Sequence, residues 1–230
     1  MAAGQQHTVK AFDQDIGELR GLISQMGGLA EQAIDNALKA LVRGDLELAA
    51  QVRTADKAID ALEAEVERAT VRIIALRAPM ANDLREVVAA LKIAAVLERV
   101  GDYAKNIAKR VPMIESEHRI EPLSILPAMA RMAAEMVHDA LDAFAARDAD
   151  KAVEVCERDN ALDDFYDSIF RTLVTHMVEN PKTISQVAHL LFVAKNLERI
   201  GDHATNVAEM VYFAASGEQL ADRDTNRGQV

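Results

Sequence analysis

Tryptophan is absent from this 230-residue chain, and aromatic residues make up only 4% of it. Proline and glycine are scarce as well, with 5 and 10 residues, so few positions interrupt a helix. The hydrophobic residues, 50% of the chain, are mainly alanine, leucine, valine, isoleucine and methionine, which pack helices closely. This composition favours an all-α protein.

Cysteine occurs once, at Cys156, which excludes an intramolecular disulfide and suits a reducing cytoplasm. The residue lies between Val155 and Glu157 in a segment with helical periodicity. We therefore interpret Cys156 as a structural thiol rather than a nucleophile.

The chain also lacks an excess of positive charge and any long hydrophobic run. The chain has 26 basic and 37 acidic residues, a net charge of −11, and no basic stripe with interleaved aromatics. This excludes nucleic acid as a partner, because phosphates repel such a surface. No segment approaches the roughly 20 apolar residues of a membrane span, and the first twenty residues hold no apolar core of a signal peptide. We expect a cytoplasmic protein that reaches a membrane only through a partner.

Hydrophobic residues recur with helical periodicity in six long segments. We place these helices at residues 8–43, 46–77, 82–114, 122–146, 149–179 and 182–216. Asp45 and Asp148 are expected to cap the second and fifth helices. Pro79 and Pro181 end those same helices, because the residue before a proline avoids the helical conformation.

One phrase of the sequence appears twice: LERVGDYAKNIAKR at 97–110 returns as LERIGDHATNVAEM at 197–210. Earlier residues of the two halves also match, at a shift of 103. We therefore predict a tandem duplication of two three-helix bundles, at 1–117 and 118–216, followed by a polar tail at 217–230 that is expected to be disordered.

The repeated phrase places two acids and an asparagine four residues apart, on one face of a helix. These residues are Glu98, Asp102 and Asn106, and then Glu198, Asp202 and Asn206. The preceding helix of each half carries a further acid pair beside its apolar face: Asp56 and Asp60, and Asp159 and Asp163. If these helices pack together, four carboxylates converge in each bundle. Oxygen clusters of this kind suit Fe³⁺, Mn²⁺, Mg²⁺ or Ca²⁺, with Zn²⁺ as an alternative.

A plain structural interpretation of these acids stays open. Acid pairs at this spacing occur elsewhere in the chain, and most such pairs form solvated helix faces. Arg99, Lys105 and Arg199 could neutralise the repeated acids as surface ion pairs. However, like charges one turn apart are mildly destabilising, and duplication has kept them at equivalent positions in both halves.

Glycine occurs inside both copies of the phrase, at Gly101 and Gly201, where it costs about 1 kcal/mol relative to alanine. This predicts the close approach of a neighbouring helix or of a ligand. His203 stands where the first copy has Tyr103, but one residue after Asp202 its side chain points about 100° away. His203 as an extra ligand is therefore the minor alternative.

The start of the third helix, Asn82-Asp83-Leu84-Arg85, differs from its counterpart Lys182-Thr183-Ile184-Ser185. We expect Asn82 to cap the helix, with Asp83 favourably placed near its N-terminus. The alternative is a partner-docking or metal-supporting role for Asp83 and Arg85 that the second half lacks.

The doubled phrase, the Asp56–Glu63 stretch and PMANDLREVVAALKI at 79–93 resemble the PhoU family, accessory and regulatory proteins of bacterial phosphate-specific transport. The resemblance covers roughly residues 12–216. It implies two three-helix bundles in a cytoplasmic homodimer that contacts the ATPase subunit of the phosphate ABC transporter and a phosphate-sensing histidine kinase. It further implies negative regulation of the phosphate-starvation (Pho) regulon, restraint of high-affinity uptake, and no catalytic activity.

The resemblance also implies metal binding, as multinuclear clusters of iron or zinc at E-x-x-x-D motifs, with manganese or magnesium as alternatives. By position, the motif residues are Glu98 and Asp102, and Glu198 and Asp202. The four aspartates of the preceding helices follow as the facing acids. Asn106 and Asn206 are the less certain ligands.

Two other classes of protein fit parts of the pattern. One is a metal-free helical adaptor. The other is a ferritin-like di-iron carboxylate enzyme, which needs Glu-x-x-His on two core helices and a glutamate on two others. The chain holds Glu115-x-x-His118 and Glu135-x-x-His138, but these lie only twenty residues apart and the first falls in the linker. They are therefore poor candidates for paired core ligands.

Overall fold

A computed structural model describes residues 2–114 and 124–220, with side chains from residue 11 onward. It contains six long helices: α1 (Ala2–Arg43), α2 (Leu46–Arg77), α3 (Asn82–Ala108), α4 (Leu126–Ala146), α5 (Ala149–Glu179) and α6 (Ile184–Ser216). Two single 3₁₀ turns, η1 (Val111–Met113) and η3 (Pro181–Thr183), follow α3 and precede α6. Within the described residues there is no strand, which confirms the predicted all-α class.

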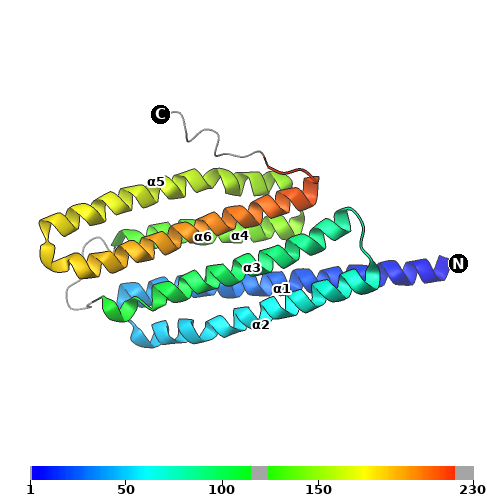
Figure 1. Cartoon of the computed structure of the whole chain (residues 1–230), viewed down its shortest axis with the longest axis horizontal. Helices are drawn as coiled ribbons and strands as arrows, with labels where there is room; N and C mark the ends of the chain where they lie inside the picture. Colours follow the sequence, from blue (N-terminus) through cyan, green and yellow to red (C-terminus); the bar gives the residue numbers. More distant parts are fainter. Residues whose placement is uncertain (1, 115–123, 221–230) are drawn as a thin grey trace.

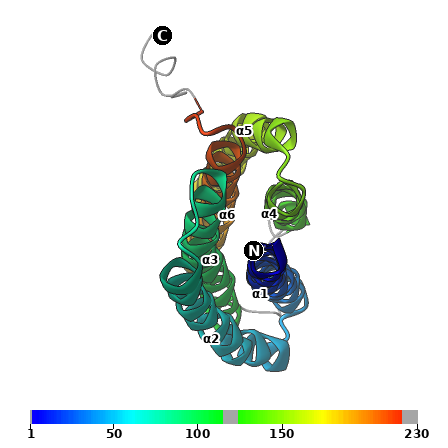
Figure 2. The same ribbon diagram turned by 90° about the vertical axis from the view of Figure 1, so that its right-hand side faces the viewer.

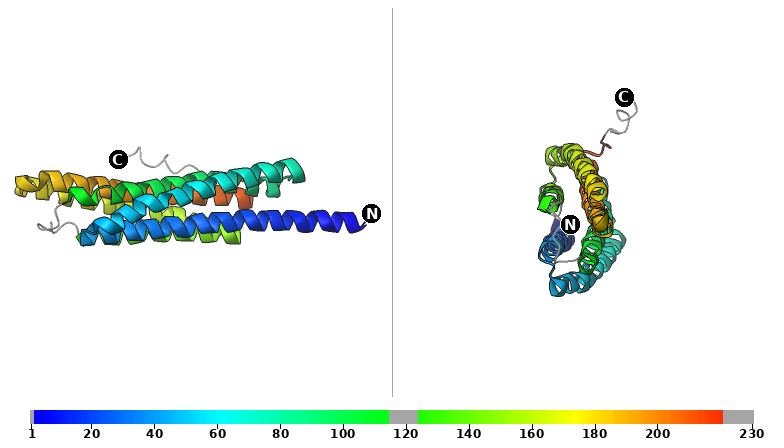
Figure 3. Two further views of the ribbon diagram at one scale, coloured as in Figure 1. Left: turned by 90° about the horizontal axis from the view of Figure 1, so that it is seen from below. Right: turned by 90° about the vertical axis from the view of Figure 1, so that its left-hand side faces the viewer.

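The helices form two layers along one long axis (Figure 1). Helices α2, α3, α6 and α5 stand side by side in a curved row, with α1 and α4 on its inner side, as the two end-on views show (Figures 2 and 3). Helices α1, α2 and α3 pack together, as do α4, α5 and α6, and the halves meet through α3–α6 and α1–α4. The α2–α3 and α5–α6 turns therefore lie at opposite ends of the molecule.

The apolar faces of the helices meet in one continuous core. Four hydrophobic residues of the repeated phrase are buried in it, as the helical period predicts: Val100, Ile107, Ile200 and Val207. Cys156 is also buried, and its thiol points to the carbonyl of Thr205 at 3.9 Å. This agrees with a structural thiol. None of the described helices is long and apolar enough to cross a membrane.

The predicted helix starts were right at two positions and wrong at a third. Asp45 accepts a hydrogen bond from the Leu48 backbone at 2.9 Å, and Asp148 accepts one from Lys151 at 3.0 Å, so both are N-caps. Asn82, however, does not cap α3. Its Oδ1 accepts a hydrogen bond from Arg85 at 2.7 Å, and the cap position is Ala81, which has no side-chain oxygen to offer.

The third and fourth helices also differ from the predicted bounds. α3 ends at Ala108, not at 114, because Pro112 disfavours helix at the residue before it and the chain turns into η1. α4 begins at Leu126 rather than at 122, with Pro127 in its first turn. The predicted boundary between residues 117 and 118, and the tail from 221 onward, lie outside the described residues.

Candidate metal site

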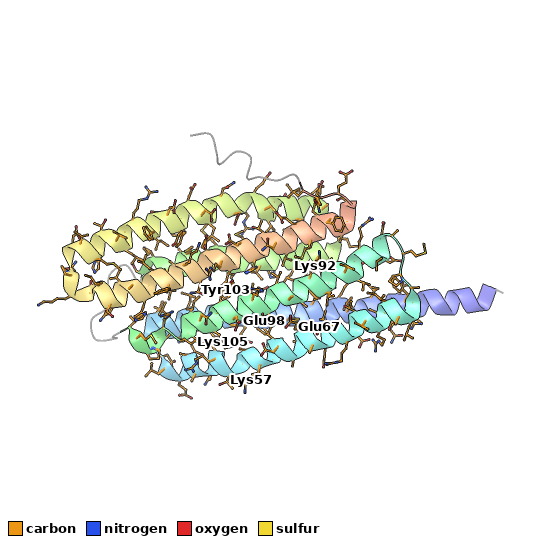
Figure 4. All side chains as sticks on the ribbon, in the orientation of Figure 1. Lys57, Glu67, Lys92, Glu98, Tyr103 and Lys105 are labelled. Carbon is orange, nitrogen blue, oxygen red and sulfur yellow. The ribbon has the colours of Figure 1, made fainter. Side chains whose placement is uncertain are left out.

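A close approach of α2 to α3 brings the acids of the first bundle together. A Cβ atom built on Gly101 would lie 2.7 Å from Cδ1 of Ile59 and 3.4 Å from Oδ1 of Asp56. Glycine at position 101 therefore lets α2 come near, as the sequence predicted, and places Asp56 against α3. The labelled side chains of Glu98 and Lys105 lie along the same stretch of α3 (Figure 4).

Lys105 supplies a positive charge in the middle of this first cluster. Its ammonium donates hydrogen bonds to Asp56 on α2 and, at 3.1 Å, to Asp102 on α3. The Asp56 side chain is only 5% exposed, so this pair is not a loose surface contact. The hydrogen bonds to Asp56 and Asp102 raise the pKa of Lys105 above its usual range. Lys105 therefore pairs with two of the repeated acids, but through a buried aspartate rather than as the surface ion pair that the structural alternative described.

Glu98 and Glu63 extend the acidic surface of the first bundle. Burial raises the pKa of Glu98, and the nearby carboxylates of Asp102, Glu63 and Asp60 raise it further. The pKa of Glu63 is raised by burial and by Glu67 and Asp60. Glu63 was not among the predicted site residues. Glu63 follows Asp60 by three residues, which places both on one helix face. The comparison of the two halves does not identify Glu63, because its counterpart in the second half is Tyr166.

The second bundle brings three aspartates into one small space. One carboxylate oxygen from each of Asp159 and Asp163 on α5 and Asp202 on α6 lies within 4.8 Å of the other two. Gly201 permits this spacing, because a Cβ atom there would overlap the Leu162 side chain of α5. Three converging carboxylates are a donor set that suits a hard divalent cation.

The carboxylates around Asp202 lie close enough to repel one another. Burial, with repulsion from Glu198, Asp159 and Asp163, raises the pKa of Asp202 to about 6, and Lys195 opposes this rise. Lys195 is bound to Glu198, with 2.6 Å between Nζ and the carboxylate. A cation among the aspartates would relieve the repulsion, so the residues present fit a bound metal ion.

The less certain ligands lie beside the clusters and have other contacts. Asn106 accepts a hydrogen bond from Lys109 at 2.9 Å, and Asn206 lies 3.4 Å from Nδ1 of His203. His203 packs against α3. Its ring stacks on Tyr103 of α3 with 5.3 Å between centroids, and its Nε2 lies 3.2 Å from the Tyr103 hydroxyl. The histidine thus belongs to the α3–α6 contact.

The described ligands of the ferritin-like alternative lie on the surface rather than in the core. His138 is an exposed residue of α4 whose Nδ1 lies 3.1 Å from Glu31 of α1. The Glu135 side chain is exposed as well and lies 3.6 Å from Arg158. Glu115 and His118 lie outside the described residues. Glu135 and His138 therefore belong to a solvated surface.

Comparison with known proteins gives one consistent result. The PhoU domain model matches residues 23–111 and 126–211, once in each bundle, which confirms the predicted tandem duplication. A phosphate-specific transport system accessory protein PhoU homolog of Zymomonas mobilis is 58% identical over 94% of this chain and 92% of its own length. A protein of the same description from Caulobacter vibrioides is 44% identical over 95% of each.

Solved structures agree with this match. The crystal structure of PhoU from Pseudomonas aeruginosa has a TM-score of 0.86 and 38% identity, and covers 90% of this chain and 100% of the solved one. The phosphate transport system regulatory protein PhoU from Streptococcus pneumoniae gives the same TM-score at 28% identity, over 92% of this chain and 100% of its own. The similarity thus extends over both bundles.

Proposed function

Because this chain belongs to the PhoU family, we propose that it is an accessory regulator of bacterial phosphate uptake. The observation that carries the proposal is the extent of the match: the family model fits each bundle, and relatives described as transport-system accessory proteins align over nearly the whole chain. The match therefore covers the whole architecture rather than one bundle or one motif.

We further propose that the protein acts in the cytoplasm, as a homodimer, by contact with the ATPase subunit of the phosphate transporter and with a sensor histidine kinase. In phosphate-rich medium it holds the phosphate-starvation genes off and restrains uptake, without a catalytic step of its own. Exposed apolar side chains at both ends of the molecule support a role in protein contacts. Met80, near the α2–α3 turn, is 80% exposed, and Val178, near the α5–α6 turn, is 75% exposed.

We also propose that the repeated acids bind metal ions. These acids lie between the second and third helices of each bundle and are called the acidic seams below. The expected metals are iron or zinc, with manganese or magnesium as alternatives. Asp159, Asp163 and Asp202 would hold the ion in the second bundle, with Glu198 beside them. The equivalent residues of the first bundle are Asp56, Asp60, Glu98 and Asp102. A bound cation would link α5 to α6 electrostatically and stabilise the face that the pair presents to partners.

Deleting the gene and measuring a phosphate-starvation reporter in phosphate-rich medium tests the regulatory role. We expect the reporter to be switched on in the deletion strain and silenced again by the wild-type gene in trans. A reporter that stays silent in a strain with no second copy of the gene contradicts the proposal.

Complementation with Asp159→Asn/Asp163→Asn then distinguishes a metal-dependent regulator from a metal-free adaptor. We expect this variant, expressed at the wild-type level, to leave the reporter partly on. If it silences the reporter as fully as the wild type does, regulation needs no metal at this site and the adaptor is the correct description.

A further inference from the structure

We propose that a pocket between the start of α3 and the end of α6 binds a small phosphorylated molecule, with the phosphate group at Arg85 and Lys92. The pocket has a volume of about 410 Å³ and is lined by both helices and by Gln219 and Leu220, which follow α6. This volume lies in the range of small-molecule sites. The inference is independent of the proposed metal binding, because none of the eight repeated acids lines this pocket.

Arg85 is held at the pocket with most of its hydrogen-bond donors unused. Its guanidinium packs against Gly217, where a built Cβ atom would lie 3.2 Å from Cζ of Arg85. Gly217 ends α6 with a φ of 82°, a conformation that favours glycine. Among the described residues, the only acceptor for this guanidinium is Oδ1 of Asn82, 2.7 Å from Nη2, and Nε is buried without a partner. A buried donor without an acceptor is costly, so the site favours a ligand that supplies one.

Lys92 adds a second positive charge to the same pocket. It follows Arg85 by two helical turns, so both side chains lie along one face of α3, beside α6, where Figure 4 labels Lys92. Side chains on a helix lean towards its N-terminus, which brings the Lys92 ammonium towards Arg85. No described carboxylate forms a salt bridge with either residue. The lining holds these two cations and one acid, Glu209, which gives it a net charge of +1. In a chain of net charge −11, such a pocket attracts an anion.

The equivalent place in the other half of the repeat is already filled. There the end of α3 lies beside the start of α6, and by the shift of 100 residues Arg110 corresponds to Met210 and Phe192 to Lys92. The Arg110 guanidinium lies 4.5 Å from the ring centroid of Phe192, and its Nη1 lies 3.3 Å from Nδ1 of His189. One end of the α3–α6 contact therefore satisfies its cation internally, and the other end leaves two cations for a ligand.

The lining of the pocket sets the chemistry of the ligand. A guanidinium presents paired N–H donors that match a phosphate group, and an ammonium adds a point charge. From α6 come two apolar side chains, Met210 and Phe213, and Phe213 is 39% exposed. An exposed aromatic ring stacks favourably on a planar group. The pocket is also far larger than a free phosphate ion. A phosphate ester with a planar or apolar body, such as a nucleoside monophosphate, therefore fits better than phosphate alone.

Calorimetric titration of the full-length, chelator-treated protein tests this site. The ligands are inorganic phosphate and the four ribonucleoside monophosphates, with the matching nucleosides as phosphate-free controls. We expect at least one monophosphate to bind, and its nucleoside to bind at least about tenfold more weakly. Lys92→Met and Arg85→Gln should each weaken binding by about tenfold or more. Lys57→Met, which removes an exposed lysine of α2 outside the pocket, should leave binding unchanged.

A charge-preserving variant separates ligand binding from a purely structural role. Lys92→Arg should bind within about threefold of the wild type, because it keeps the positive charge. Helix content and urea unfolding check that Arg85→Gln folds. If it does not fold, Lys92→Met and Lys92→Arg decide alone, because Lys92 is exposed.

The possible failures are distinct from those of the proposed function. Wild-type protein that binds none of these ligands overturns the inference and leaves the regulatory role to its own reporter test. Binding that Lys92→Met leaves unchanged also overturns it. So does a nucleoside that binds as tightly as its monophosphate, or free phosphate that binds as tightly as any ester.

Discussion

Replacing Asp202 by asparagine is expected to stabilise the metal-free protein at neutral pH. Asp202 is held among Glu198, Asp159 and Asp163, and its pKa is raised from 3.8 to about 6. The folded state therefore binds the proton more tightly than the unfolded state does. Between about pH 4 and pH 6 the free energy of unfolding falls as the pH rises, and above that window the destabilisation is complete.

The size of this effect follows from the pKa. The difference corresponds to about 3 kcal/mol, at about 1.4 kcal/mol for each pKa unit. The Asp202 carboxyl group is partly desolvated by its neighbours, but the residue as a whole is exposed, so solvent screening reduces the contribution to about 1 kcal/mol. Asp202→Asn should therefore raise the free energy of unfolding by about 1 kcal/mol at pH 7.5 and leave it unchanged near pH 4.

Urea denaturation of chelator-treated protein at the two pH values measures this difference. Asp102→Asn is the matched control, because Asp102 accepts a hydrogen bond from Lys105 and its removal should bring no gain at pH 7.5. Saturating Mn²⁺ should reverse the ranking, since the wild type gains binding energy that Asp202→Asn loses. Metal-free Asp202→Asn that is less stable than the wild type at pH 7.5 would refute the electrostatic reasoning.

Three further substitutions test the packing that positions the two seams. Glu86→Ala should lower the free energy of urea unfolding by about 2 kcal/mol, because the buried Glu86 pairs with Arg20 at 2.5 Å and with Arg147; an unchanged midpoint would contradict this. Gly101→Val should cost about 2 kcal/mol and lower the melting temperature, since its side chain would overlap Ile59. Asp148→Ala should cost about 1 kcal/mol in urea unfolding by removing the N-cap of α5, and a loss below 0.3 kcal/mol would argue against that role.

The fold could be predicted from the sequence because its signals are local and repeated. Six helices in two bundles are indicated by three features of the sequence: apolar residues at the helical period, few proline and glycine residues, and one repeated segment. The ends of the helices are harder to predict, because they depend on single residues and on side-chain hydrogen bonds. Pro112 stops α3 six residues before the predicted end, and Asn82 bonds to Arg85 rather than to the backbone of its own helix.

The candidate site was only partly predictable. Helical spacing identified the eight repeated acids, since residues four apart share a face. It could not show that the Lys105 ammonium reaches across to Asp56 on α2, because this contact depends on how closely Gly101 lets the helices approach. Nor could it show that His203 stacks on Tyr103, which requires α3 and α6 to be neighbours. Contacts between helices decide which acids converge.

Anomalous X-ray diffraction from crystals of the wild-type protein soaked in Mn²⁺ tests most directly whether the acidic seam of the second bundle is a cation site. We predict an anomalous peak within about 2.5 Å of oxygens from Asp159, Asp163 and Asp202. Crystals that bind Mn²⁺ elsewhere, or not at all, and show no peak beside these three aspartates would contradict this account.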